Sequence, residues 1–415
     1  MKRKAQAEPG GAPDSPINPA PGDLFVSGLD QESFSIVVKD DHWSLALSEK
    51  GGSVVMKNLM RSFVISIFLI FLVPQISQPC TTFFFNNNGH TVFGKNYDWR
   101  IERGLVFINK RGVSKAPRGY IEKDPGPFAH WASKYGSLTF NQYGREFPMG
   151  GINEAGLVVE IMALMNTEYP TPDDRPAVME LQWIQYQLDN FSKVEQVIAS
   201  DSQIRIYRTG ELGAHYLVAD KEGNCATIEF INGKMVYHTR ETLPIKVLAN
   251  STYSESMEYL KKHKGFGGDQ SISGSSQSLD RFVRAANMLK DYNSNIQASS
   301  ADYAFNILDN VAQLSWAWGT KWSIVYDIQK LRIYFRTFSD KQIRYMDLHS
   351  FDFSCQSPVK VLDMNLDGSG DMKDNFLDYT KKMNLDLIRH SWKESNMPDS
   401  FLERLSTYPE RTRCD

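Results

Sequence analysis

Short apolar runs separated by turn residues dominate the chain after residue 80. TTFFF, TVFGKNY and LVFINKRG predict strands, because β-branched and aromatic residues favour a pleated surface and the NNNG and RG sequences favour turns. GGINEAGLVVEIMAL has a glycine-rich turn that leads into an apolar strand. The sequence AHYLVAD-KEGN-CATIEFI-NGK-MVYHT predicts a three-strand meander, and KWSIVYDIQKLRIYFRTFSD predicts a further hairpin.

Apolar residues recur at helical spacing in three stretches. Helices are expected within 176–198, within 278–292 with Ser278 as N-cap, and over 301–314. Blocks of strands and blocks of helices, without strict βαβ alternation, indicate an α+β layered domain. No repeat or linker divides residues 80–362, so we expect one domain there.

Residues 56–79 have the pattern of a secretory signal peptide. Lys57 and Arg61 precede an apolar segment at 63–73, which Pro74 ends. This segment is too short to span a bilayer. We therefore expect a secreted or periplasmic protein with no stable membrane anchor after leader removal.

The leader begins at Met56 instead of the chain start, which makes residues 1–55 an extension to be explained. Residues 1–22 are rich in Pro, Gly and charge, as disordered tails are, whereas 34–47 show two alternating runs typical of a hairpin. We favour translation from Met56 or Met60, which would make 1–55 non-native. A genuine N-terminal extension is the alternative.

Composition excludes several classes of protein. The 415 residues are 41% hydrophobic and 23% charged with a net charge of −3, so no basic surface for nucleic acid is expected. No zinc-finger, P-loop or dinucleotide motif is present. The four cysteines, Cys80, Cys225, Cys355 and Cys414, are too few for a disulfide scaffold and too widely spaced for a metal site. We expect no cofactor and no metal.

The segment 363–415 follows the 80–362 domain as a strand, a turn and a polar helical region over 376–412. Asp363, Asn365, Asp367, Gly368 and Asp371 match the spacing of an EF-hand loop. Position 12 is Asp374 instead of Glu, and the preceding CQSPVKVL looks like a strand. We interpret 363–374 as an acidic turn, with calcium binding as the alternative.

Cys80 stands directly after the leader, and three interpretations compete for it. A lipid-modified cysteine needs small residues before it, whereas Gln78 and Pro79 precede this one. A buried structural thiol is common. In the third interpretation, Cys80 becomes the first residue, and its freed α-amine, with a pKa of about 7.7–8.0, deprotonates the thiol beside it.

A carboxylate could position that amine. Asp98 in GKNYDW follows Cys80 across one predicted turn, a separation that suits a hairpin returning the second strand beside the first. Asp98 would then lie close to the residue-80 backbone.

The motifs CTTFFF…GKNYDW, GGINEAGL, VLANS and DRFVR, in this order, resemble the choloylglycine hydrolase and penicillin V acylase family. The resemblance covers roughly residues 80–350. It implies an N-terminal nucleophile amidase with a four-layer αββα sandwich, which cleaves a linear amide of an N-acyl small molecule.

The resemblance also implies roles for individual residues. Cys80 would be nucleophile and base, Asp98 would bind the α-amine, Asn250 would form part of the oxyanion hole, and Arg281 would support the network around the cysteine. The alternatives are structural: Asp98 as a turn former, Asn250 as the cap of a helix near STYSESMEYL, and Arg281 as a surface residue.

Two positions depart from the family pattern. Lys95 stands where bile-salt hydrolases have arginine; it still supplies positive charge to a thiol but lacks the bidentate fork, and it could be only a solvated charge. Ten residues beyond Asn153, a candidate supporting residue, the chain has Ala163, which cannot donate from its side chain. We therefore expect a backbone N–H as the second oxyanion donor, that of the residue after Ala163.

The substrate is less defined than the chemistry. Aromatic and Met-rich segments at 147–165 and 316–322 favour an apolar acyl group, although such residues also build cores. Acyl transfer to an amine is the alternative reaction, and an inactive secreted binding protein is the alternative class. The only partner expected is the small-molecule amide, and a homo-oligomer is compatible with the sequence.

Overall fold

The computed structural model describes residues 35–39, 42–46, 80–87, 89–116, 127–209, 213–292, 299–315, 317–395 and 397–414. The chain forms two compact units, Met1–Gln75 and Ile76–Asp415. In the first, β1 (Ser35–Lys39) pairs antiparallel with β2 (His42–Ala46), which is the hairpin that the alternating pattern predicts. The predicted leader at 56–79 lies outside the described residues.

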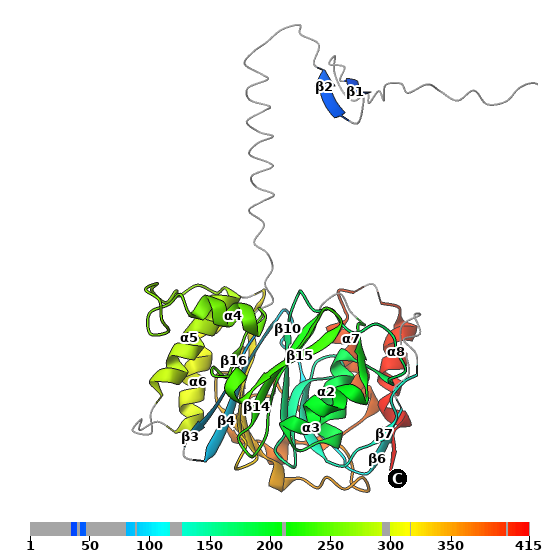
Figure 1. The fold of residues 1–415 in the computed structure, drawn as a ribbon. Helices are drawn as coiled ribbons and strands as arrows, with labels where there is room; N and C mark the ends of the chain where they lie inside the picture. The colour runs from blue at the N-terminus through cyan, green and yellow to red at the C-terminus, as the bar shows by residue number, and fades with distance from the viewer. Residues whose placement is uncertain are drawn as a thin grey trace, which may run out of the picture. The chain divides into compact units, whose positions relative to one another are not determined.

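Two large sheets build the second unit (Figure 1). The seven-stranded sheet runs in the order β16 (Val247–Leu248), β3 (Thr81–Asn87), β4 (His90–Trp99), β17 (Gly319–Asp327), β18 (Arg332–Thr337), β19 (Arg344–Asp347) and β21 (Gly370–Asp371). The nine-stranded sheet runs in the order β15 (Lys234–Thr239), β14 (Cys225–Ile231), β13 (Ala214–Ala219), β10 (Val158–Ala163), β9 (Pro148–Asn153), β8 (Ser137–Asn141), β5 (Leu105–Asn109), β20 (Lys360–Asp363) and β22 (Leu377–Asp378).

Helices cover the outer face of each sheet (Figure 1). α5 (Ser278–Asp291) and α6 (Ser300–Asn310) pack on the seven-stranded sheet, and α4 (Tyr253–Leu260) packs against α5. α2 (Glu180–Asn190) and α3 (Val194–Ala199) pack on the nine-stranded sheet. The molecule is therefore the α+β, four-layer αββα sandwich that the resemblance implies.

The sequence of β13 does not alternate between apolar and polar residues, because both faces of this strand are buried. Leu217 and Ala219 belong to the core between the sheets, whereas Tyr216 and Val218 belong to the core beneath α2 and α3. Successive side chains of a strand point to opposite faces, and here both faces are covered. The meander β13–β14–β15 and the hairpin β17–β18 are present as predicted.

Local details differ from three predictions. Gln277, not Ser278, is the N-cap of α5, and Ser278 is the first helical residue. The third helix ends at Asn310 instead of residue 314. The glycine pair of GGINEAGL lies inside β9, and the turn begins at Asn153.

The C-terminal segment is more than a polar helical region. Besides α7 (Lys381–Ser391) and α8 (Asp399–Thr407), which pack together with Phe147, it supplies β20, β22 and β23 (Arg413–Cys414). β23 pairs with β6 (Val113–Lys115), which in turn pairs with β7 (Trp131–Ala132), and a parallel pair joins β11 (Ala177–Met179) to β12 (Arg205–Tyr207). A disulfide joins Cys355 to Cys414, which the cysteine count did not predict.

In the predicted acidic turn, carboxylates bind neighbouring backbone. Asp363 accepts from the N–H of Asn365, and Asp371 accepts from the N–H of Lys373. Such contacts are typical of Asx turns.

Candidate active site

Cys80 lies directly before β3, at the edge where this strand meets β16 and β4. β3 and β4 pair in the register Thr81↔Asn96. The second strand therefore returns past Cys80, as the separation of Cys80 and Asp98 along the chain predicted. The buried Cys80 thiol lies 3.9 Å from the backbone carbonyl oxygen of Asp98. The β3–β4 hairpin therefore brings Cys80 and Asp98 together.

Asp98 carries a buried carboxyl group without an ion-pair partner among the described residues. The residue is fully buried within β4, and a contact with the Thr320 side chain is its one hydrogen-bonding influence, which lowers the pKa. Burial raises the pKa of Asp98 to about 7, against the opposing positive charge of Arg281. The alternative of a turn former is wrong, because the carboxylate caps no turn.

Asn250 follows β16 and contacts Cys80 directly. Its Oδ1 accepts from the backbone N–H of Cys80 at 2.7 Å and from Nη2 of Arg281 at 2.8 Å, and its Nδ2 donates to the carbonyl of Ala163 at 2.9 Å. Two donors on one side and a carbonyl on the other fix the orientation of the amide. The helix-cap alternative is wrong, because Thr252 caps α4.

Arg281 is buried at the start of α5, where it faces the β3 edge. Its Nη1 donates to the carbonyl of Cys80 at 2.5 Å and to the Thr81 hydroxyl, while Nε donates to the carbonyl of Ser276 at 3.0 Å. Burial lowers the pKa of Arg281 to about 10, and Asp98 opposes this shift. A guanidinium with this pKa remains charged at neutral pH, and the alternative of a surface residue is wrong.

Lys95 is also buried, so it is not a solvated strand charge. Its Nζ donates to the carbonyl of Ile161 and forms an ion pair with Glu160 at 3.5 Å. Burial raises the pKa of the Cys80 thiol, and the charge of Lys95 is the strongest of the influences that lower it. Glu160, an acidic residue inside the apolar run VVEIMAL, was missed, although its position in such a run signals a buried partner.

The backbone N–H expected to be the second oxyanion donor is already engaged in a hydrogen bond. The N–H of Leu164, the residue after Ala163, donates to the carbonyl of Gly213 at 3.0 Å and is occupied. Neighbouring residues of an antiparallel strand direct their N–H and C=O groups to opposite sides. Ala163 therefore directs its backbone groups away from β13, to the side from which Asn250 approaches its carbonyl.

Asn153 is a structural residue. Its Nδ2 donates to the carbonyls of Leu188 and Phe191, and its Oδ1 accepts from the N–H groups of Ala155 and Leu157. These contacts fix the β9–β10 turn against the end of α2. The structure gives it no hydrogen bond with Cys80 or Asn250, so a supporting role for Asn153 stays a prediction.

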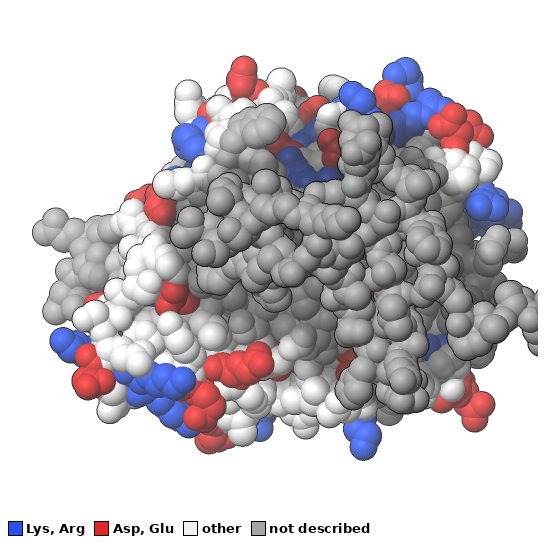
Figure 2. All heavy atoms as spheres, turned by 90° about the horizontal axis from the view of Figure 1, so that it is seen from above, with Lys and Arg blue, Asp and Glu red and all other residues white. Residues whose placement is uncertain are grey.

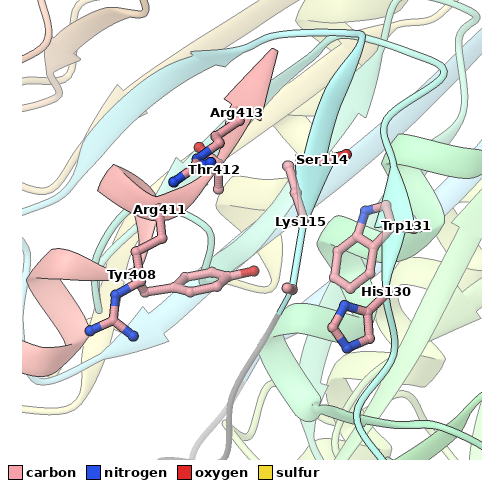
Figure 3. Close-up of a pocket in the computed structure, with 9 residues that line it drawn as sticks. Ser114, Lys115, His130, Trp131, Tyr408, Arg411, Thr412 and Arg413 are labelled. Atoms are coloured by element: carbon pink, nitrogen blue, oxygen red, sulfur yellow. The ribbon is translucent and has the colours of Figure 1, made fainter. Parts of the chain in front are cut away.

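A separate hollow lies near the chain's C-terminus (Figure 3). It has a volume of about 570 Å³ and is lined by Ser114, Lys115, Ala116, His130, Trp131, Tyr408, Arg411, Thr412 and Arg413. None of the expected site residues lines it. Figure 3 shows the Arg411 guanidinium on the far side of the Tyr408 ring from Trp131, so the cationic groups do not converge.

The described surface has no single charge character on the face that Figure 2 shows. Acidic and basic side chains are interspersed there, in keeping with the net charge of −3. Within the described ranges, no helix is long and apolar enough to cross a membrane, and no group of His, Cys, Asp or Glu has the arrangement of a metal site.

Comparisons with known proteins identify the family of the chain. The model of the linear amide C-N hydrolases, choloylglycine hydrolase family, matches residues 80–361. A penicillin V acylase of Pectobacterium atrosepticum is 26% identical in a 333-residue alignment that covers 70% of this chain and 86% of that protein. The chain belongs to the choloylglycine hydrolase family of linear amide C-N hydrolases.

Solved structures show the same fold. The penicillin V acylase from Agrobacterium tumefaciens superimposes with a TM-score of 0.63 at 25% identity, covering 72% of this chain and 98% of its own. A mutant conjugated bile acid hydrolase from Clostridium perfringens gives a TM-score of 0.57 at 19% identity, covering 70% and 98%. The sandwich is thus an N-terminal nucleophile hydrolase fold.

Proposed function

We propose that the protein is an N-terminal cysteine amidase that hydrolyses the linear amide bond of an N-acyl small molecule, with Cys80 as nucleophile. The observation that carries the proposal is the convergence on Cys80 of three groups: Asp98, a buried carboxyl group without an ion pair, Asn250, an oriented amide, and Arg281, a buried guanidinium. A structural thiol requires none of these groups.

The mechanism begins when the peptide bond before Cys80 is cleaved. The freed α-amine lies at the position whose N–H now bonds to Asn250, next to Asp98. It takes the thiol proton, and the resulting ammonium would form an ion pair with the Asp98 carboxylate. Lys95 and Arg281 stabilise the thiolate electrostatically.

The thiolate attacks the amide carbonyl, and the oxygen gains negative charge. The second N–H of Asn250 and the backbone N–H of Ala163 lie on the side where this oxyanion forms. The ammonium of Cys80 then gives its proton to the leaving nitrogen, and the C–N bond breaks to leave a thioester. Water, deprotonated by the same amine, hydrolyses the thioester and restores the thiol.

An apolar acyl group fits the residues beside the site. Met165 follows Ala163 closely, and its side chain is 69% exposed. Leu314 is 90% exposed and adjoins Gln313, whose side chain donates to the Ser276 carbonyl that also accepts from Arg281. Exposed apolar side chains next to a reactive centre favour an apolar substrate portion.

Export and trimming are part of the proposal. A leader beginning at Met56 would direct the protein to the periplasm or outside the cell. Signal peptidase prefers small residues before the cut, and Ser77 fits this preference better than Pro79. Cleavage there leaves Gln78 and Pro79, which a second cleavage must remove before Cys80 becomes the first residue.

The proposal is tested with a panel of N-acyl amides that differ in acyl length, using release of the amine as the assay. We expect hydrolysis and, after rapid quenching, an acyl group on the peptide that contains Cys80. Faster product formation on addition of hydroxylamine, with less free acid, would favour acyl transfer. Binding without turnover or labelling of Cys80 would favour the binding protein and contradict the amidase.

A further inference from the structure

A buried histidine–glutamate pair lies behind the proposed oxyanion residue. His215 is on β13 and Glu229 on β14, the neighbouring strand, and both side chains are almost completely buried. Nδ1 of His215 lies 3.1 Å from Oε1 of Glu229. Two ionisable groups are costly to bury in a sheet core unless they are paired and hydrogen-bonded.

The pair contacts both ends of one short segment. Nε2 of His215 lies 2.8 Å from the carbonyl oxygen of Ala249, and Oε1 of Glu229 accepts from the backbone N–H of Tyr253 at 2.9 Å. Asn250 lies between these two points. The segment 249–253 is thus held at its start by the histidine and at its end by the glutamate.

The proton positions follow from the partners. A carbonyl oxygen only accepts, so Nε2 of His215 carries a hydrogen. Nδ1 faces a carboxyl oxygen, so the pair holds one further proton between Nδ1 and Oε1. Glu229 also places negative charge at the N-terminus of α4, where the helix dipole favours it.

The direction of the histidine explains why it reaches the segment. Leu217 and Ala219, on the same face of β13 as His215, pack in the core between the two sheets. The histidine side chain therefore crosses this core from the nine-stranded sheet to Ala249, directly after β16 of the other sheet. It connects the two layers at the residue before Asn250.

We propose that His215 and Glu229 are positioning residues that hold segment 249–253, and with it the amide of Asn250, in the geometry required for oxyanion binding. This inference rests on the proposed function for its catalytic consequence. Ser278 adds a third restraint, because its hydroxyl accepts from the backbone N–H of Asn250 at 2.9 Å. The side-chain contacts with Cys80, Ala163 and Arg281 then complete the orientation.

Two polar substitutions separate the contacts of His215. In His215→Gln, the longer amide can donate near the position of Nε2 and keep the Ala249 contact. In His215→Asn, the shorter amide can serve Glu229 but does not reach Ala249. Thr227→Val is the matched control, because Thr227 is equally buried on β14 and its hydroxyl has no hydrogen-bond partner among the described residues.

We expect His215→Asn to lower kcat roughly 10- to 100-fold with KM little changed, because a small displacement of a catalytic group has effects of this size. His215→Gln should recover most of the loss, and Thr227→Val should resemble the parent. In an Asn250→Ala background, His215→Asn should lower kcat no further, since residues that act through one another are not additive.

Parent-like kcat in His215→Asn, or a full additive loss in the Asn250→Ala background, would overturn the inference. Hydrogen–deuterium exchange supplies a measurement independent of activity: the peptide containing 249–253 should exchange faster in His215→Asn than in Thr227→Val. If the parent protein has no amidase activity, the proposed function fails, and exchange alone decides on the positioning role. Equal exchange in both variants would contradict it.

Discussion

Two buried free cysteines, Cys80 and Cys225, have different surroundings. Burial raises the pKa of both thiols, that of Cys225 to about 12. Cys225 begins β14 and packs in the apolar core between the sheets. Charged groups influence both thiols, Lys246 and Asp220 at Cys225 and Lys95, Arg281 and Asp98 at Cys80. At Cys80, the amide of Asn250 and the guanidinium of Arg281 also bind the backbone of the cysteine.

The difference teaches that thiol burial alone does not mark a nucleophile. A core cysteine behaves as a small hydrophobe and needs only packing partners. The region around Cys80 contains the carboxyl group of Asp98 and the cations of Lys95 and Arg281, and all three are buried at a cost in free energy. Such groups are expected where charge must be handled during a reaction.

Removing each thiol in turn tests most strongly whether Cys80 and Cys225 have different roles. Cys80→Ala should abolish amide hydrolysis and keep the fold, because little volume is lost, whereas Cys225→Ala should remain active. Steady-state amine release and thermal unfolding measure the two effects. More than a few per cent of activity in purified Cys80→Ala would remove Cys80 as nucleophile.

The amide beside Cys80 provides the next largest effect. Asn250→Ala should lower kcat about 10²- to 10³-fold, the usual cost of losing one oxyanion donor. Asn287→Ala, at an asparagine of α5 whose side chain donates to Asp291, should leave kcat near that of the parent. An unchanged kcat in Asn250→Ala would mean that this residue only builds the segment before α4.

The charge of Lys95 should affect the pH dependence of kcat/KM. Lys95→Met removes the strongest influence that lowers the pKa of the thiol, so thiolate formation should require higher pH. We expect the acidic limb of kcat/KM to move up by about one pH unit, while Lys95→Arg, which keeps the charge, should move it less. A limb that does not move in Lys95→Met would show that this charge does not act on the reacting thiol.

For Asp98 we expect a smaller effect, which concerns the free energy of unfolding of protein that still carries Pro79. The pKa of its carboxyl is 3.8 in the unfolded chain and about 7 in the folded one, so the folded state loses stability as pH rises through this interval. Asp98→Asn removes this loss. The variant should match the parent near pH 4 and exceed it above pH 7, by on the order of 2–4 kcal/mol.

Denaturant unfolding at several pH values measures that difference. In protein that begins at Cys80, the ammonium partner should abolish the advantage of Asp98→Asn. An equal advantage in both forms would show that the α-amine does not pair with Asp98.

Local patterns were sufficient for some of the site. Cys80 and Asp98 are joined by one hairpin, so counting residues across a turn predicted that they meet. Asn250 and Arg281 are separated from Cys80 by 170 and 201 positions, and only the family resemblance brought them to it. No periodicity encodes contacts at such distances, because they depend on how the sheets and helices pack.

Other features depended on hydrogen-bond direction or on pairing. The backbone donor was expected after Ala163, but strand alternation directs the N–H of Leu164 to Gly213. The disulfide between Cys355 and Cys414 was not predicted, since four cysteines allow several pairings and sequence does not select among them. The contacts of Asn153 with the carbonyls of Leu188 and Phe191 could not be predicted either, because they depend on how α2 packs on the sheet.

The most direct test of the account joins the identity of the first residue to activity. Protein beginning at Cys80 and protein that begins at Met1 should be compared by intact mass, N-terminal sequencing and amide hydrolysis in the same assay. While Pro79 is attached, the nitrogen of Cys80 is an amide without basic character, and the thiol lacks its base. We predict that only the form beginning at Cys80 is active; full activity in protein that still carries residues before Cys80 would contradict the α-amine mechanism.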